Sequence, residues 1–220
     1  MDLREALRGT GSVRAFTDEP VAHATLFDIL DDARFAPSGG NRQGWRVAVV
    51  EDPSRRRRLA DLMSPVWSDY LAEAATGVTP FNVVVPVPDH PPAEAMANPL
   101  LDDIEHVPVV LAVAIDLARV SMMDFGNPTR PPVVGGASIY PFCWSIVLAA
   151  RARGLGGVLT TFMSRAEAAA GPELGLPPGH ALAATVFLGH PVHQPTKLTR
   201  NAVASFATID RFDGPPLAAG

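Results

Sequence analysis

Residues 36–45, which read APSGGNRQGW, combine residue types that suit contact with a flat, partly polar ligand. Glycine carries no side chain and serine only a small one, so the backbone there can approach a planar group closely. The amides of Asn41 and Gln43 can both donate and accept hydrogen bonds along the polar edge of such a group. The candidate binding residues of this loop are Pro37, Ser38, Gly39, Asn41 and Gln43.

Two other segments offer groups that bind phosphate. Ser12 and Arg14 follow a short helical segment in a glycine-rich turn, and Lys197 and Arg200 lie in a polar turn after the last strongly apolar segment. Hydroxyl and cationic side chains form short, strong hydrogen bonds with phosphate oxygens. Each of these residues alone is more often an exposed surface residue than a ligand, so their spacing by itself decides nothing.

Residues 154–161 form a further candidate loop, in which a glycine-rich stretch precedes Thr160 and Thr161. The glycines permit close approach of a ligand, and the threonines add backbone and hydroxyl donors. These glycines are not a dinucleotide-binding fingerprint, because they follow a predicted helix rather than a strand.

No metal site is expected. His190 and His193 have a spacing seen in some metal sites, but Pro191 forbids a helix between them. No cysteine or carboxylate cluster lies nearby in the sequence to complete a ligand set.

The spacing of apolar residues predicts the elements that must position these candidates. Helices are expected over residues 2–8, 23–35, 137–153 and 164–175, and over 53–75 as two helices or as one broken at Pro65. Strands are expected over residues 45–50, 107–116, 158–161 and 181–188, with an edge strand at 80–87. The order shows no regular βαβ repeat, which predicts an α+β or mixed α/β fold.

Residues 1–220 are expected to form one domain with loop excursions at 86–106 and 119–136. Long loops within a compact domain are often functional, so the second loop is a candidate lid or pocket wall; the alternative is an insertion that the fold merely tolerates. The helix predicted over 137–153 is apolar on nearly every side. Such a helix packs at the centre of a fold or against a second subunit.

The composition excludes several classes of protein. With 47% hydrophobic and 19% charged residues, the chain can bury a sizeable core. A net charge of -5 argues against nucleic-acid binding, and the run Arg55–Arg58 is interpreted as a solvated helix face. The single cysteine, Cys143, fits a reducing compartment. No signal peptide or membrane span is visible, so a cytoplasmic protein without a membrane partner is expected.

Taken in order, these segments resemble the nitroreductase family of FMN-dependent oxidoreductases. Members carry an Arg-Arg-Ser-x-Arg-x-Phe pattern, an Ala-Pro-Ser-x-x-Asn-x-Gln-Pro-Trp loop, a Gly-Leu-Gly segment and a basic turn after a final Gly-Tyr-Pro. Here the corresponding stretches read TGSVRAF at 10–16, APSGGNRQGW at 36–45, GLG at 154–156 and LGHP at 188–191, followed by KLTR at 197–200.

The resemblance implies an α+β, nitroreductase-like fold with a central, mostly antiparallel sheet flanked by helices. It also implies a homodimer with intertwined subunits and FMN at the subunit interface. Ser12 would bind the FMN phosphate, and Arg14 the phosphate or the pyrimidine edge. Arg200, with Lys197, would also hold the phosphate.

The resemblance places further residues around the flavin ring. Pro37, Ser38, Gly39 and Asn41 would contact the ring from the neighbouring subunit. Thr160 and Thr161 would bring donors to its N5 and O4 side, and Tyr140 would line the pocket.

The activity implied is ping-pong hydride transfer from NAD(P)H through flavin N5 to a nitroaromatic, quinone or related acceptor. No side chain is expected to act as a catalytic acid or base, because the flavin carries the chemistry. Two alternatives stay open: the same fold with flavin-degrading or dehalogenating chemistry, and a non-catalytic protein that stores or senses a flavin.

The chain departs from the family pattern at two places. Thr10 and Gly11 replace the paired arginines, which removes a usual phosphate fork, and Arg8 could substitute only with a shift of the backbone. Gly44 replaces the proline before Trp45. These departures predict weaker FMN binding than is typical, and they leave room for a different flavin or a deazaflavin.

Overall fold

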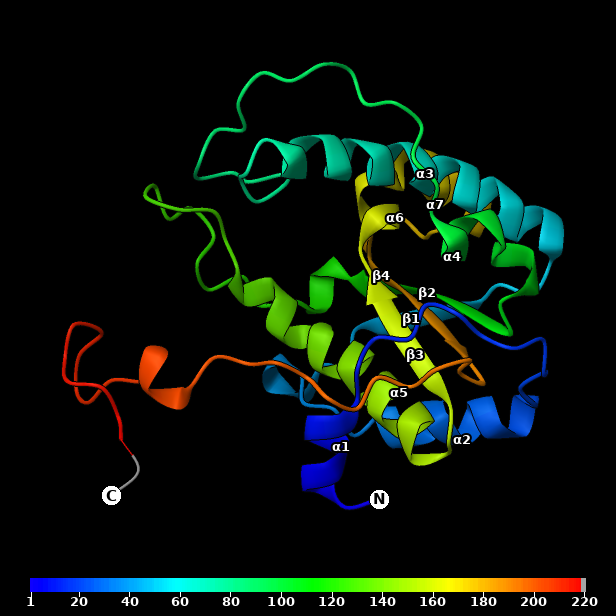
Figure 1. Ribbon diagram of the computed structural model, residues 1–220, viewed down its shortest axis with the longest axis horizontal. Coiled ribbons are helices and arrows are strands. Elements are labelled where there is room, and N and C mark those ends of the chain that lie inside the picture. The colour runs from blue at the N-terminus through cyan, green and yellow to red at the C-terminus, as the bar shows by residue number, and fades with distance from the viewer. Residues whose placement is uncertain (219–220) are drawn as a thin grey trace.

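Four apolar segments pair into one antiparallel sheet in the computed structural model, which describes residues 1–218 (Figure 1). The strands are β1 (Trp45–Val49), β2 (Val109–Asp116), β3 (Gly156–Thr160) and β4 (His180–Gly189), in the order β1-β2-β4-β3. All three pairings are antiparallel. The strands at 45–50, 107–116, 158–161 and 181–188 are therefore confirmed, with β3 beginning two residues earlier than expected.

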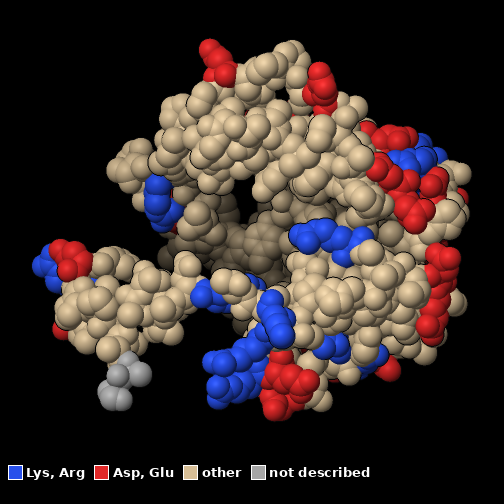
Figure 2. Space-filling view, in the orientation of Figure 1, with Lys and Arg blue, Asp and Glu red and all other residues tan. Residues whose placement is uncertain are grey.

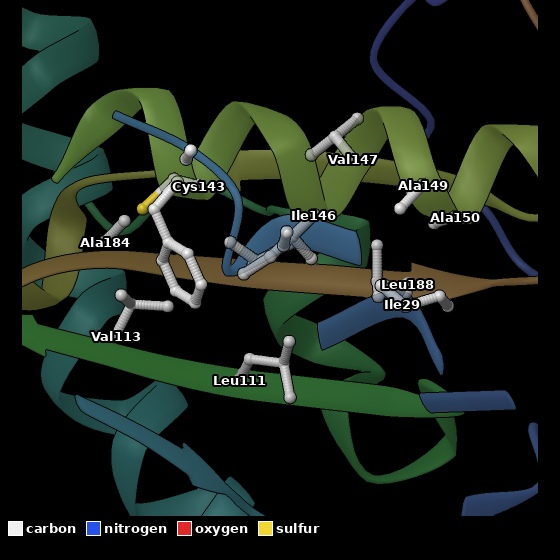
Figure 3. Close-up of a cluster of buried hydrophobic side chains, with 14 of the residues drawn as sticks. Ile29, Leu111, Val113, Cys143, Ile146, Val147, Ala149, Ala150, Ala184 and Leu188 are labelled. Carbon is white, nitrogen blue, oxygen red and sulfur yellow. The ribbon is translucent and has the colours of Figure 1, made fainter. Parts of the chain in front are cut away.

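Both faces of the sheet are covered, because the central strand β2 buries side chains in both directions. Leu111 and Val113 of β2 join one core, with helices α2 (His23–Ala33) and α5 (Tyr140–Ala152). Figure 3 shows this core, in which Cys143 and Ile146 of α5 lie over β4 and β2. Because Cys143 is buried here, the pKa of its thiol is raised to about 12.

The opposite face of the sheet carries a second core. Val110 and Ala112 of β2 point into it, against helices α3 (Pro53–Ala75), α6 (Phe162–Arg165) and α7 (Glu167–Leu174). The helix expected over 164–175 is thus split into α6 and α7. A short N-terminal helix, α1 (Leu3–Gly9), precedes the first predicted ligand segment.

The helix α3 is continuous through Pro65, so residues 53–75 form one helix and the break expected at this proline does not occur. Its second arginine corrects another expectation. The run Arg55–Arg58 was expected to be a solvated face, but Arg56 is 8% exposed and donates to the carbonyls of Val50, Glu105 and Val107. Only its neighbours in the run lie toward solvent.

The edge strand expected at 80–87 does not form. The carboxamide of Asn82 instead accepts the backbone N–H groups of Val84 and Val85, at 2.8 and 2.7 Å. These donors are therefore used locally, as is common for asparagine in turns. The side chains of Val83, Val84 and Val85 are exposed rather than packed on the sheet.

The loop expected at 86–106 ends earlier than predicted, because residues 99–106 are helical. Asn98 caps α4 (Pro99–Asp102) by accepting from Leu100 N–H, and Pro99 occupies the first helical position. The 3-10 helix η2 (Ile104–His106) follows, and Leu101 and Ile104 are fully buried. Residues 119–136 are mostly loop, as expected, ending in η4 (Val134–Ser138).

The C-terminal segment runs away from the body of the molecule (Figure 1). From about residue 200 it forms an arm, here defined as residues 201–218, with one short 3-10 helix, η5 (Val203–Ser205). Phe206 and Phe212 of the arm are 71% and 105% exposed. Such a concentration of exposed aromatic side chains marks an interaction surface.

Candidate functional site

The segment around Ser12 is held between strand β3 and the start of the C-terminal tail. Val13 N–H donates to the Gly157 carbonyl of β3 at 3.0 Å, and Gly11 N–H donates to the Pro195 carbonyl at 3.2 Å. Leu198 also lies against Gly11. The structure therefore brings Ser12 and the tail residues around Lys197 together, although they are far apart in the sequence.

The two departures at Thr10 and Gly11 have a structural reason. Thr10 is buried, and its hydroxyl donates to the Ala6 carbonyl at the end of α1. A Cβ at Gly11 would lie 2.7 Å from the Pro195 side chain and 2.8 Å from its carbonyl oxygen. An arginine at position 11 would therefore require the tail to move.

Three cationic side chains lie near this junction without a carboxylate partner. Among the described residues, no carboxylate comes within 4.0 Å of Arg14, Lys197 or Arg200. All three are exposed, and Arg200 donates only to the carbonyl of Thr199. Figure 2 shows a hollow in this face, between α3 and α5, with lysine or arginine side chains at several points of its rim. These cations are available to an anionic ligand.

The threonine pair lies at the far end of β3 from that junction. Between Gly157, which accepts from Val13, and Thr161 the extended chain spans on the order of 13 Å. Thr160 Oγ is buried and has no hydrogen-bond partner in the described structure. An unpartnered buried hydroxyl is costly, so a group that bonds to it would stabilise this end of the strand.

The glycines before the threonines serve packing. A Cβ at Gly156 would lie 2.6 Å from the Val13 side chain, and one at Gly157 would lie 2.6 Å from the Leu188 side chain. The space on the Cβ side of these two glycines is therefore filled by the protein itself, and the approach of a ligand to this segment stays a prediction.

The loop at 37–43 is folded tightly around its own polar groups. Gln43 N–H donates to Ser38 Oγ at 2.9 Å, and the Gln43 amide donates to Asn41 Oδ1 at 3.1 Å. Gly39 N–H is 3.3 Å from Ser138 Oγ, which joins the loop to the end of η4. Asn41 and Gln43 have φ angles of 54° and 49°. Strained backbone of this kind in non-glycine residues is concentrated at functional sites.

The same loop lies at the opposite end of the sheet from Ser12. Gly44 C=O accepts from Asp116 N–H, and Asp116 pairs with His180, whereas Gly157 pairs with Leu188. The stretch of β4 from His180 to Leu188 spans on the order of 25 Å. Within one chain, the loop at 37–43 and the segment of Ser12 and Arg14 therefore do not meet.

Gly44 is enclosed by another part of the chain. A Cβ there would lie 3.0 Å from the Arg119 side chain and 3.3 Å from the Asp116 carbonyl. Arg119 in turn donates to the carbonyl of Arg42 at 3.1 Å. This packing explains why glycine replaces the proline of the family pattern.

Tyr140 begins α5 and is half-exposed. Strand β4 has a bulge at Ala183, which is left out of the pairing with β2, and the Tyr140 hydroxyl donates to the Ala183 carbonyl at 3.4 Å. Burial raises the pKa of this phenol. The hydroxyl is thus used within the fold, and a role for Tyr140 in the ligand pocket stays a prediction.

Two positioning residues were missed by the sequence analysis. Gln194 donates from Nε2 to the carbonyls of Gly11 and Pro195, which fastens the N-terminal segment to the tail. Ser138 holds the loop through Gly39. Neither lies in a recognisable motif, because each acts on a segment distant in the sequence.

Among residues 1–218, no group of three or more His, Cys, Asp and Glu side chains is placed to hold a metal ion. None of the helices described is long and apolar enough to cross a membrane.

The fold and these clusters define an α+β protein with a cationic junction at one end of an edge strand and an unpartnered hydroxyl at the other. A sequence profile of the nitroreductase family matches residues 7–190, and the chain belongs to that family. It is 30% identical over 200 residues to an NADH dehydrogenase of Thermus thermophilus, covering 88% of this chain and 89% of the relative. It is 28% identical over 213 residues to a nitrobenzene nitroreductase of Ectopseudomonas oleovorans, covering 85% and 86%.

Solved structures show the same fold. The NADPH:FMN oxidoreductase of Vibrio harveyi, solved in complex with NAD+, superposes with a TM-score of 0.67 at 20% identity, covering 96% of this chain and 77% of that one. The predicted family, the predicted fold and the assignment to the oxidoreductases are therefore confirmed.

Proposed function

We propose that this protein is an FMN-dependent oxidoreductase that takes a hydride from NAD(P)H and passes electrons to a nitroaromatic, quinone or related acceptor. The observation that carries the proposal is the junction of Ser12, Arg14, Lys197 and Arg200 at one end of β3, with the unpartnered Thr160 hydroxyl at the other. A cofactor with a phosphate tail and a flat polar ring needs these two kinds of group at separate ends. FMN and NADPH occur in the name of the Vibrio harveyi protein, and nitrobenzene in that of the Ectopseudomonas protein.

The residues present fit FMN. The phosphate would be held by the Ser12 hydroxyl and by Arg14, Lys197 and Arg200, none of which pairs with a carboxylate within residues 1–218. Thr160 Oγ and the adjacent Thr161 would bond to the polar side of the ring. When bound, the flavin would supply the hydride chemistry, and the protein's part would be placement and charge stabilisation.

A homodimer is part of the proposal, with each flavin bound between two subunits. The strained loop at 37–43 lies on the order of 25 Å along the sheet from Ser12 of the same chain, so it is far from the phosphate end of its own subunit's site, and in the proposed dimer it would contact the ring bound by the second copy. Two exposed apolar surfaces support the association: Trp144 on α5, which is 40% exposed, and the aromatic residues of the C-terminal arm.

The first experiment titrates FMN with wild-type protein and with Arg200→Gln, and flavin fluorescence reports binding. Loss of one charge-assisted hydrogen bond to phosphate is expected to weaken FMN binding about 10- to 100-fold. Arg211→Gln is the matched control, because Arg211 lies on the arm and pairs with Asp213. Equal affinities for all three proteins would remove Arg200 from the site.

The reaction itself is tested by steady-state kinetics with NADH, NADPH and nitrobenzene. Parallel double-reciprocal lines are expected, because both substrates would use one open face in turn. Stoichiometric FMN binding with no NAD(P)H oxidation under any acceptor would instead favour a storage or sensing protein. A reduced flavin normally regains its visible absorbance in air. If the absorbance does not return after reduction of the protein, flavin-degrading chemistry would be favoured.

A further inference from the structure

A pocket of about 630 Å³ opens beside Thr161, on the α3 and α6 side of the sheet. Its walls include Tyr70 of α3, Phe81 of the following loop, and Phe162, Ser164 and Arg165 of α6. Because Thr161 borders this pocket, a ligand in it would lie next to the proposed ring end of the flavin site. The inference below therefore rests on the proposed function.

The pocket has aromatic walls. The Tyr70 and Phe162 rings lie 6.3 Å apart in an edge-to-face arrangement, and the Tyr70 and Phe81 rings are also 6.3 Å apart. Behind them Trp67 stacks on Tyr70 at 5.9 Å. Rings arranged in this way offer faces and edges to a planar aromatic ligand.

Phe81 is held in place at an energetic cost. Its φ angle is 54°, in the left-handed region that bulky residues seldom adopt. The carboxylate of Glu73 on α3 fixes it there by accepting the Phe81 backbone N–H. A strained backbone that persists because its surroundings enforce it is a feature of ligand-binding positions.

The pocket also has a cation without an anion. The Arg165 guanidinium lies over the Phe81 ring, 4.5 Å from its centroid, and no carboxylate of the described residues comes within 4.0 Å of it. Glu73, the nearby acid, is engaged by Phe81 N–H. Ser164 Oγ is buried and unpartnered in the described structure. Both groups suit a ligand oxygen that carries negative charge.

We propose that this pocket selects flat aromatic acceptors that carry a carboxylate, with Arg165 as the residue that determines the preference. The aromatic part would lie among Tyr70, Phe81 and Phe162. The carboxylate would meet the Arg165 guanidinium, which lines the pocket and already lies over the Phe81 ring. Arg165 is thus a specificity residue and takes no part in the hydride transfer.

The test compares 4-nitrobenzoate with its neutral methyl ester, using the FMN-loaded protein. Affinities are measured without NAD(P)H, by quenching of tryptophan fluorescence, so the readout does not require turnover. The kcat/KM values for the two compounds are then measured with NAD(P)H. Wild-type protein is expected to prefer the acid, and Arg165→Gln to lose at least tenfold of that preference in both measurements.

Three variants separate charge from shape. Arg165→Lys keeps the charge and should restore part of the preference. Phe81→Leu should weaken the acid and the ester alike, because it removes only the ring. Arg55→Gln, at an exposed arginine at the start of α3, should behave as wild type.

Two results would overturn the inference. One is the same acid-to-ester ratio in wild type and Arg165→Gln. The other is a loss of FMN affinity in Arg165→Gln as large as its loss of acid preference, which would assign the guanidinium to the cofactor. Failure of the proposed function is read separately, from the flavin titration. If FMN does not bind, the same quenching titration on the flavin-free protein still decides whether an Arg165-dependent anion preference exists.

Discussion

Arg56 illustrates how a single residue can connect three parts of the chain. Its guanidinium lies under the end of β1 and donates to carbonyls of Val50, Glu105 and Val107 at 2.7–3.0 Å. Arg56 is 8% exposed, and this burial lowers its pKa. Three carbonyls accept from this one side chain, so Arg56 is a structural residue inside a run that otherwise faces water.

Arg56→Met is expected to lower the free energy of unfolding by about 3 kcal/mol, because three buried carbonyls would lose their donor. Urea denaturation followed by circular dichroism measures this. Arg55→Met, at the exposed neighbour, should change stability by no more than about 0.5 kcal/mol. Similar midpoints for the two variants would show that water replaces the guanidinium without cost.

At the residue scale, the motifs located the candidate positions but not their surroundings. Ser12, Arg14, Lys197 and Arg200 were identified from local sequence, and the structure brings their segments together. The sequence alone could not show that Pro195 and Leu198 fill the space beside Gly11, because those contacts join opposite ends of the chain. For the same reason Gln194 was missed, and the ligand roles of all these residues stay predictions.

At the scale of elements, the loop at 119–136 is organised by one carboxylate. Asp124 accepts from Arg130 at 2.6 Å and from Val133 N–H at 2.7 Å. These hydrogen bonds lower the pKa of Asp124 to about 2, and the bond from Arg130 has the largest effect. The carboxylate form is therefore favoured in the folded loop, and its contribution is present above the ordinary pKa of 3.8 and is lost as the pH falls through about 2.

Asp124→Asn is expected to loosen this loop at neutral pH while the sheet stays intact. Amide hydrogen exchange at Val133 and Val134 should accelerate, because both N–H groups donate to Asp124. Asp89→Asn, at an exposed loop aspartate, serves as the control. Unchanged exchange in Asp124→Asn would mean that the prolines of the loop, rather than the carboxylate, fix its shape.

Elements with a strong apolar pattern were predictable, and those decided by side-chain caps were not. β2 and β4 follow from their strongly apolar sequences. The segment at 80–87 looked equally apolar, but Asn82 takes the backbone donors that a strand would need. In the same way, α4 depends on Asn98 and Pro99 acting as a start signal within a proline-rich stretch.

At the scale of the whole molecule, the apolar helix α5 has one buried and one open side. Phe142 and Ile146 are buried in the core, and Phe142 stacks on Trp45 with ring centroids 4.7 Å apart. Tyr140 and Trp144 lie on the open side, 44% and 40% exposed. This division agrees with a helix that packs against both its own sheet and a second subunit.

Trp144→Asp is expected to dissociate the proposed dimer, because a charge would be buried without a partner at the interface. Sedimentation velocity measures the mass of the particle, and circular dichroism confirms that the fold persists. Leu3→Asp, at an exposed apolar residue of α1, is the control. A dimer that survives Trp144→Asp would place the interface elsewhere.

The exposed C-terminal arm affects how this chain reaches its native state. Residues 201–218 extend from the body and expose aromatic side chains that their own subunit does not cover. In the proposed dimer these residues gain their burial only from another chain, so part of the stabilisation arises in a bimolecular step. The thermal midpoint should then rise with protein concentration, and this rise should be smaller for a chain ending at residue 200, in which only the α5 surface is left to form the dimer.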